Sequence, residues 1–303
     1  MQSLYDSINI QPEISLLTNY LRTEKEVGLS MLRLDKIHPI VSGNKLFKLQ
    51  YFLQEAKSSK HKTIITFGGA YSNHLAATAF ACKEAGLKCI GFVRGENPVS
   101  LSSTLLFCRQ NGMQLEFISR ADYKNISDEF LIMLLHKYGD HTLIPEGGFS
   151  ITGAHGAEDI MKLFDGENYS HICCPIGTAT TFAGLIKGNK SNAQIIGFSA
   201  LKNLGDIEFR LKKLNVDKSK SYKSISDYHF GGYAKKTTAL IAFMNNFYRD
   251  YKIPLDFVYT AKMMFGVYNL LEESYFAPGS NILCIHTGGL QGNNSLPPGT
   301  LNF

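Results

Sequence analysis

Residues 63–86 read TIITFGGAYSNHLAATAFACKEAG, and this stretch decides the fold class. An apolar run of strand length at 63–69 ends in two glycines, and 73–86 places apolar residues at helical spacing before a closing glycine. The same alternation continues along the chain. We expect further strands at 88–93, 114–119, 171–177, 194–200 and 281–289, and further helices at 101–112, 127–139, 151–164, 181–188, 237–251 and 260–274.

Continuously apolar strands that alternate with helices are typical of parallel sheets covered on both faces. The sequence therefore predicts an α/β fold of open, mostly parallel, twisted sheets covered by helices. A length of 303 residues with 44% hydrophobic side chains favours about two domains. Composition marks no boundary, and the loop at 147–153, GGFSITG, is the best candidate for a hinge.

Several functional classes fit the composition poorly. The net charge of +5 is dispersed, and the densest basic run, 212–223, lies in a polar segment, so we expect no nucleic-acid partner. The six cysteines show no CxxC spacing and lie mostly in apolar runs, which favours buried thiols, a reducing compartment and no metal site. We expect no signal peptide at 1–14 and no membrane span, and hence a cytoplasmic protein.

Ligands of open parallel sheets bind beyond the carboxyl ends of the strands, so the informative residues should follow those ends. Before the first of them, SGNKLFKL (42–49) places Lys45 and Lys48 three apart. If a helix begins at Asn44, the two ammonium groups share one face, and like charges lower the pKa of an amine. The simpler interpretation is a solvated helix start with apolar residues beneath.

Two strand ends could bind anions. In FGGAYSNH (67–74), Ser72 and Asn73 are good helix caps at a turn with free N–H groups, although an ordinary cap with His74 facing solvent explains the stretch equally well. In PIGTATTFAG (175–184), backbone N–H groups and threonine hydroxyls could cradle a phosphate. This run has neither GK[ST] nor GxGxxG, and a capped strand-to-helix turn is the alternative.

Two further strand ends carry hydroxyl groups. In IHTGGLQG (285–292), Thr287 precedes a glycine pair that permits close approach of a ligand, and a simple turn explains it nearly as well. In DFVYTAKMMFG (256–266), Tyr259 precedes a helix and is either a core residue or an acid–base group. Together, an amine that can become nucleophilic, two anion cradles and two hydroxyl groups suit a cofactor with a phosphate and an aldehyde.

At these residues the sequence resembles a known family. GNKLFKL followed by FGGAYSNH is similar to the GNKxxKL and GGxxSNH motifs of the 1-aminocyclopropane-1-carboxylate deaminase / D-cysteine desulfhydrase family, and the likeness extends from about Leu32 to Gly289. The resemblance implies a pyridoxal 5'-phosphate (PLP) enzyme of fold type II that acts on a small amino acid as a homodimer. It places the cofactor in the cleft between a large domain (1–46 and 151–303) and a small domain (47–150).

The resemblance also implies roles for individual residues. Lys45 would bond to the cofactor aldehyde, Lys48 would lie close to the phosphate, and Thr287 would face the ring nitrogen. The phosphate loop would comprise Gly177, Thr178, Ala179, Thr180 and Thr181. Substrate would contact Ser72, Asn73, His74 and Tyr259, with Asn73 also near the ring hydroxyl, and the catalytic residues would be Lys45, Ser72 and Tyr259.

Details within the family favour one activity. The deaminases that resemble this chain carry SNQ and a glutamate after the active-site tyrosine, whereas this chain has SNH and Thr260. A neutral hydroxyl at Thr287 gives a weaker electron sink, which suffices for elimination of a thiolate. We therefore expect D-cysteine to be converted to pyruvate, hydrogen sulfide and ammonia. The alternatives are a 1-aminocyclopropane-1-carboxylate deaminase, a D-serine dehydratase-like enzyme, or a PLP- or phosphate-binding protein without turnover.

Overall fold

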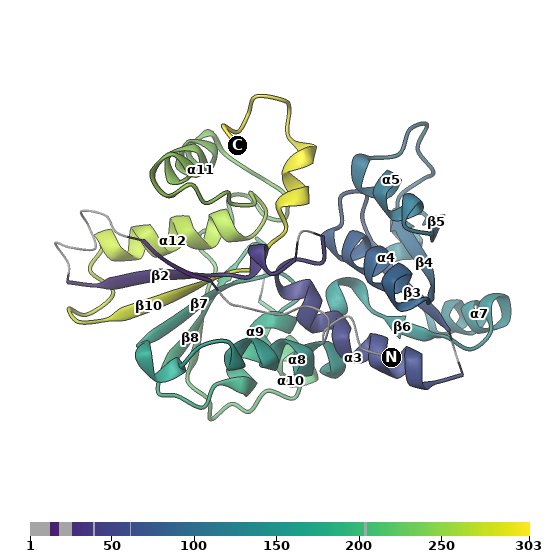
Figure 1. The fold of residues 1–303 in the computed structure, drawn as a ribbon, viewed down its shortest axis with the longest axis horizontal. Coiled ribbons are helices and arrows are strands. Elements are labelled where there is room, and N and C mark those ends of the chain that lie inside the picture. Colours follow the sequence, from purple (N-terminus) through teal and green to yellow (C-terminus); the bar gives the residue numbers. More distant parts are fainter. Residues whose placement is uncertain (1–12, 18–25, 39, 61, 203–204) are drawn as a thin grey trace.

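A computed structural model describes residues 13–17, 26–38, 40–60, 62–202 and 205–303. The stretch in which we expected no signal peptide, 1–14, lies almost wholly outside these ranges. The described chain forms two separate sheets, and all but one of their strand pairings are parallel. Helices cover the sheets, so the α/β fold class expected from the sequence is confirmed (Figure 1).

The larger sheet has the strand order β1-β2-β10-β7-β8-β9. Only the edge pair β1 and β2 is antiparallel. Helices α11 (Thr238–Tyr251) and α12 (Thr260–Glu272) lie over one face of this sheet, and α8 (Ile151–Glu158), α9 (Thr180–Gly188) and α10 (Ile207–Lys213) over the other (Figure 1). The strands are β1 (Ile14–Leu16), β2 (Gly28–Arg33), β7 (His171–Ile176), β8 (Gln194–Ser199), β9 (Tyr222–Ile225) and β10 (Asn281–His286).

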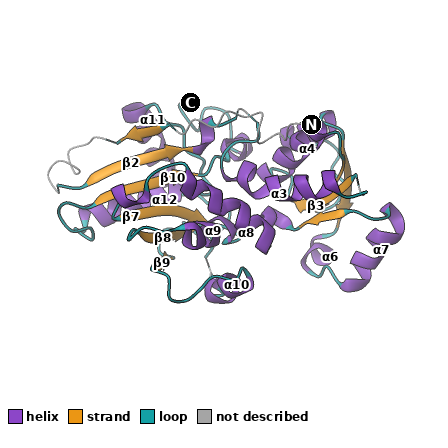
Figure 2. Ribbon diagram, turned by 60° about the horizontal axis from the view of Figure 1, so that its bottom comes forward, coloured by secondary structure: helices purple, strands orange, loops and turns teal. Residues whose placement is uncertain are grey.

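The smaller sheet is wholly parallel, with the order β5-β4-β3-β6. Alternate residues of its strands face opposite sides: Ile64 packs in a core with α4, while Phe67 and Phe92 pack in a cluster with Leu134 of α7. Helices α4 and α7 lie on opposite sides of this sheet (Figure 2). The elements are β3 (Thr63–Gly68), α4 (Asn73–Ala85), β4 (Lys88–Arg94), α5 (Ser103–Gln110), β5 (Met113–Ile118), α6 (Arg120–Lys124), α7 (Asp128–Tyr138) and β6 (Thr142–Ile144).

Helix α3 (Asn44–Ser58) joins the two halves of the molecule. It packs against α8 on one side and α4 on the other, and Phe47 and Leu49 are buried along it. One apolar core contains these residues together with Ile64 of β3 and Ile285 of β10, so it reaches from one sheet to the other. The strands of the smaller sheet all fall within the expected small domain, 47–150, although the domain boundaries themselves remain a prediction.

Element boundaries differ from the expected ranges in instructive places. The strand expected at 281–289 ends at His286 because Gly288 and Gly289 adopt left-handed φ angles of 72° and 95°. The helix expected at 151–164 ends at Glu158 and continues as a 3₁₀ turn, a common ending for α-helices. The six cysteines are all buried and free, as expected. No helix among the described residues is long and apolar enough to cross a bilayer.

Candidate active site

The first turn of α3 carries two buried amines. The helix begins at Asn44, as the sequence predicts, and Lys45 and Lys48 lie on it one turn apart. The Lys48 side chain is only 4% exposed, and its Nζ donates to the carbonyl oxygen of Gly147 at 3.1 Å. Lys45 is partly buried and donates to Asn44 Oδ1 at 2.6 Å. A solvated helix start therefore does not describe this pair.

Burial makes both amines easier to deprotonate. Loss of solvent lowers the pKa of Lys45 from 10.5 to about 8, although the carboxylate of Asp256 opposes the shift. The pKa of Lys48 is lowered well below its usual value, first by burial and then by the charge of Lys45. A lysine whose pKa is near 8 presents a substantial fraction of neutral, nucleophilic amine at physiological pH.

Asn44 connects this turn to two strand ends of the larger sheet. Its backbone N–H donates to the carbonyl oxygen of Thr287 at 3.2 Å, directly after β10. Its side-chain Nδ2 donates to Thr181 Oγ1 at 2.7 Å, in the first turn of α9. The preceding Gly43 has a φ of 68°, and a Cβ there would lie 2.0 Å from the Thr287 oxygen. The lysines, Thr287 and the expected phosphate loop thus meet at one point.

The start of α9 is suited to bind an anion. Ala179 precedes the helix with a φ of 69° and provides no side-chain cap, so first-turn N–H groups are free for a ligand. The hydroxyls of Thr178 and Thr180 lie 2.9 Å apart at the same turn. Lys48 is close by, because its partner Gly147 abuts the Thr178 methyl group. A lysine amine, two hydroxyls and an uncapped helix start suit a phosphate, whose negative charge would favour the protonated form of Lys48.

The start of α4, which follows β3 of the smaller sheet, has two buried acceptor atoms without hydrogen-bond partners, Asn73 Oδ1 and His74 Nδ1. Asn73 Nδ2 donates to the carbonyl oxygen of Gly289 at 3.1 Å, and Asn73 Oδ1 has no partner. Ser72 uses its oxygen to cap the helix, accepting from the Leu75 N–H at 3.2 Å. The Asn73 contact links the start of α4 to the turn that follows β10 of the larger sheet.

His74 has a defined proton position. The hydroxyl of Thr66 lies 2.9 Å from the carbonyl oxygen of Ile144, to which it donates, and 2.9 Å from His74 Nε2. A hydroxyl has one proton, so Nε2 must donate to Thr66, and the unpartnered Nδ1 of a neutral ring is an acceptor. Burial, with the charges of Lys45 and Lys48, lowers the pKa of His74 to about 3 and keeps the ring neutral.

Tyr259 is anchored at the start of α12 by a carboxylate that the sequence reasoning missed. Asp256 is wholly buried and accepts from the backbone N–H groups of Val258, Tyr259 and Thr260 at 3.1, 2.8 and 2.9 Å. The ring of Tyr259 lies against Gly177, where a Cβ would be only 2.9 Å from Tyr259 Cε1. The sequence contained one signal for Asp256, because an aspartate shortly before a predicted helix is typical of a helix cap.

Tyr233 is a second tyrosine that the sequence did not indicate. Its ring meets that of Tyr259 edge to face, with centroids 6.2 Å apart. Burial raises the pKa of Tyr259 well above its usual value, and Tyr233 and Asp256 add to the shift, so its hydroxyl keeps its proton. Tyr233 lies in an irregular loop between β9 and α11, and no periodic pattern could have placed it here.

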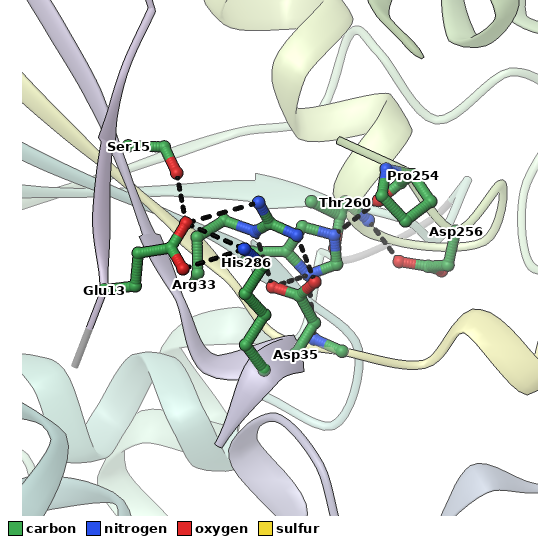
Figure 3. A network of polar contacts seen from close by, with 10 residues as sticks. Glu13, Ser15, Arg33, Asp35, Pro254, Asp256, Thr260 and His286 are labelled. Atoms are coloured by element: carbon green, nitrogen blue, oxygen red, sulfur yellow. Dashed lines mark hydrogen bonds and ion pairs between the residues drawn. The ribbon is translucent and has the colours of Figure 1, made fainter. Parts of the chain in front are cut away.

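A polar network surrounds His286, the residue before Thr287 (Figure 3). Arg33, at the end of β2, donates through Nε and Nη2 to the two carboxylate oxygens of Asp35 at 2.8 and 2.6 Å. Asp35 lies 3.5 Å from Nδ1 of the buried His286, and the opposite ring nitrogen, Nε2, lies 2.8 Å from the carbonyl oxygen of Pro254. This network ties His286, the last residue of β10, to the end of β2 and to the segment before α12.

These features fit a cofactor that carries an aldehyde and a phosphate. A buried amine with a lowered pKa can bond to the aldehyde, and the uncapped start of α9 beside Lys48 can hold the phosphate. The unpartnered acceptors Asn73 Oδ1 and His74 Nδ1 could accept hydrogen bonds from a bound ligand. Within the described ranges, no three or more His, Cys, Asp or Glu residues are grouped so that they could hold a metal ion.

Comparison with known proteins decides the family. Residues 17–288 match the family described as pyridoxal-phosphate dependent enzymes. The chain belongs to this family. A Thermotoga maritima protein named "Putative 1-aminocyclopropane-1-carboxylate deaminase" is 30% identical over 270 residues, which cover 83% of this chain and 85% of the relative.

Solved structures confirm the fold of this pyridoxal-phosphate dependent enzyme. The crystal structure of a 1-aminocyclopropane-1-carboxylate deaminase homologue superposes with a TM-score of 0.80 at 24% identity and covers 94% of this chain and 91% of its own. The O-acetylserine dependent cystathionine β-synthase of Helicobacter pylori has a TM-score of 0.70 at 15% identity, with 98% of both chains covered. The expected fold type II architecture and the cofactor, PLP, are therefore confirmed.

Proposed function

We propose that this PLP enzyme catalyses the α,β-elimination and deamination of a small amino acid, with D-cysteine as its preferred substrate. The observation that carries the proposal is the partly buried amine of Lys45, whose pKa is about 8, beside an uncapped helix start that suits a phosphate. When bound, PLP supplies an aldehyde that joins covalently to amines and a ring that withdraws electrons from the α-carbon.

The residues of the chain divide the remaining tasks. Lys45 would hold the cofactor, and its amine would be the base that removes the α-proton of the substrate. Lys48 and the hydroxyls of Thr178 and Thr180 neutralise and orient the phosphate. The first-turn N–H groups of α4 are donors for the substrate carboxylate. Tyr259, which keeps its proton, would donate a hydrogen bond to the departing β-substituent.

The choice of thiolate as leaving group rests on neutral groups at two positions. Thr287 is 5% exposed and offers a hydroxyl where the resemblance places the ring nitrogen. Thr260 is wholly buried after Tyr259, and its hydroxyl has no partner. Neither residue supplies a carboxylate that would hold a proton on the pyridine nitrogen. A ring without that proton is a weaker electron sink, which suits elimination of a good leaving group.

A second candidate is the deamination of 1-aminocyclopropane-1-carboxylate. The name of the Thermotoga maritima relative favours it, as does the superposition on a deaminase homologue. Opening an unactivated ring demands more of the electron sink than thiolate elimination does. A D-serine dehydratase-like reaction and cofactor binding without turnover are the other outcomes that the experiment separates.

The experiment is a spectroscopic and product assay of the purified holoenzyme. Addition of D-cysteine should change the visible absorbance of the cofactor and release sulfide, ammonia and pyruvate in equal amounts. Release of ammonia and a keto acid from 1-aminocyclopropane-1-carboxylate, with no sulfide from D-cysteine, would establish the second candidate instead. A chromophore that responds to no D- or L-amino acid would overturn both.

Two variants test whether Lys45 is the amine that bonds to the cofactor. Lys45→Ala should lose the cofactor's lysine-bound absorbance and at least about 10²- to 10⁴-fold of the turnover, the usual contribution of one acid–base group. Lys60→Ala, which removes an exposed lysine just beyond α3, should behave as wild type. We also propose that the enzyme is a cytoplasmic homodimer, for which sedimentation at twice the mass of one chain is the test of assembly.

A further inference from the structure

Lys262 is a second buried lysine, outside the cofactor cradle. It lies in the first turn of α12, and its side chain is 1% exposed. Its Nζ donates to the backbone carbonyl oxygens of Gly232 at 2.7 Å, His229 at 2.8 Å and Ala200 at 3.5 Å. The protonated amine has the three N–H donors that three acceptors call for. Burial lowers the pKa of Lys262 from 10.5 to about 8, so the protonated form still predominates at pH 7. The side chain therefore places an ammonium ion inside a cage of carbonyl oxygens.

The cage holds together segments that are distant in sequence. Ala200 follows β8, whereas His229 and Gly232 belong to the connection between β9 and α11. This connection is irregular, with positive φ angles of 51°, 91° and 114° at Phe230, Gly231 and Gly232. Such a backbone has few regular hydrogen bonds of its own, and two of its carbonyl oxygens are directed at Lys262. The hydrogen bonds from Lys262 therefore hold in place a segment that has little regular structure.

The two segments that the Lys262 hydrogen bonds join each lead to a tyrosine of the candidate site. Tyr233 directly follows Gly232 in the chain, and Tyr259 lies three residues before Lys262. The rings of these two tyrosines meet with centroids 6.2 Å apart. A second contact reinforces the link, because Phe230 packs edge to face on Phe265 of α12 at 4.9 Å.

We propose that the Lys262 ammonium is an internal cation that fixes the 229–233 segment to α12 and thereby holds Tyr233 against Tyr259 at the active site. Lys262 is accordingly a positioning residue for the reaction proposed above, on which this inference rests. It touches neither Lys45 nor the phosphate cradle in any contact of the described residues, and it acts through the segment that it holds.

Hydrogen exchange tests the fixation directly. In Lys262→Met holoenzyme, the methionine replaces the aliphatic part of the lysine side chain but offers no donor to the carbonyl oxygens. The protected amides of the segment, those of Gly231, Gly232 and Lys235, should exchange about 10- to 100-fold faster, as expected for loss of hydrogen bonds from a charged donor. Unchanged exchange at these amides would overturn the proposal.

Steady-state kinetics separates positioning from a purely structural role. Lys262→Met should lower kcat/KM about tenfold while the cofactor stays bound, because a displaced Tyr233 disturbs the site that Tyr259 forms. Lys220→Met is the matched control: its Nζ donates to the Asn189 carbonyl oxygen at 3.1 Å, and it precedes β9, whereas the 229–233 segment follows that strand. It should change neither exchange at 229–233 nor kcat/KM. Faster exchange in Lys262→Met without a change in kcat/KM would show a merely structural lysine and overturn the positioning role.

Two further variants complete the test. Lys262→Arg keeps a charged group with several donors and should recover much of the lost protection and kcat/KM. Should Lys262→Met not fold, Lys262→Gln, which keeps donors but no charge, takes its place with the same expected direction. A wild-type enzyme without turnover would defeat the proposed function, and the exchange measurements would then decide by themselves whether Lys262 fixes the segment.

Discussion

The reactivity of Lys45 follows from what surrounds its amine. Burial lowers the pKa from 10.5 to about 8, and the opposing charge of Asp256 prevents a larger fall. The amine is therefore largely neutral above pH 8 without any base to deprotonate it. Lys48, whose pKa burial also lowers, lies one turn away and pairs with the phosphate in our proposal.

We expect this pKa to govern uptake of the cofactor. The rate at which cofactor-free protein takes up PLP should rise about tenfold per pH unit below pH 8 and level off above it, because only the neutral amine attacks the aldehyde. Stopped-flow absorbance between pH 6.5 and 9.5 measures it. A blocked lysine in solution is the control, and its rate should still be rising at pH 9.5. The same behaviour in the protein would contradict the lowered pKa.

His74 should make the protein sensitive to acid. Its pKa is about 3 in the folded protein, against an ordinary value of 6.5, so the unfolded chain binds more protons between these values. Stability from this group is present above pH 6.5 and falls as pH decreases, by about 1.4 kcal/mol per unit, or ~2 kcal/mol at pH 5. Urea denaturation at pH 7 and pH 5 should therefore show a smaller loss in His74→Gln than in wild type.

The control for this measurement is an exposed histidine. His136 on α7 is exposed, so His136→Gln should keep the wild-type difference between the two pH values. Equal losses in His74→Gln and His136→Gln would mean that His74 is not held neutral in the folded protein.

At the scale of the elements, the contact between the start of α3 and the end of β10 leaves no room for a side chain at Gly43. Gly43 and Gly86 have similar positive φ angles, 68° and 66°, but their ψ angles are −152° and 30°, and their surroundings differ as well. A Cβ at Gly43 would lie 2.0 Å from the Thr287 oxygen, whereas nothing lies within 4 Å of one at Gly86. Alanine at Gly86 therefore meets only the cost of a left-handed helical residue, whereas alanine at Gly43 meets both a conformation that is nearly restricted to glycine and the contact with Thr287.

Alanine at the two glycines should have different consequences. Gly86→Ala should lower the free energy of unfolding by about 1 kcal/mol, the cost of a left-handed alanine, and leave PLP affinity unchanged. Gly43→Ala should cost several-fold more and weaken PLP binding more than tenfold, because α3 must move away from Thr287. Urea denaturation and PLP titration measure the two effects. Equal effects of the two substitutions would contradict the importance of this contact.

At the scale of the whole molecule, the two sheets share a core. Phe47 on α3 is wholly buried in a cluster that contains Ile64 of the smaller sheet and Ile285 of the larger one. Because α3 packs on both sides, disturbing its centre should affect the two sheets together. The same helix carries Lys45 at its start, so the stability of this junction and the geometry of the site are connected.

We expect the two sheets to unfold in one transition. Phe47→Ala should destabilise the protein by about 3–5 kcal/mol and shift the entire urea transition, followed by far-UV circular dichroism, to lower urea. Phe209→Ala is the control, since this ring is 58% exposed, and it should leave the transition in place. A Phe47→Ala protein that unfolds in two separated steps would show that the halves are independent.

Local patterns in the sequence determined the fold class and most elements of the site. Apolar runs followed by helical spacing predicted β3, α4, β7 and α9, because burial on a sheet imposes these periods on the residues themselves. The motif around Lys45 predicted the cofactor, which the family match confirmed. The short strands β6 and β9 escaped this reasoning, since three or four residues contain too little periodicity.

Only the tertiary structure decided which groups meet and in what state of protonation. The pKa of Lys45, the neutral acceptor of His74 and the carbonyl cage of Lys262 all depend on burial and on partners distant in the chain. Asp256 and Tyr233 join the site for the same reason. Periodicity records which face of an element is buried, whereas solvent exclusion and convergence of polar groups arise only when the elements have packed.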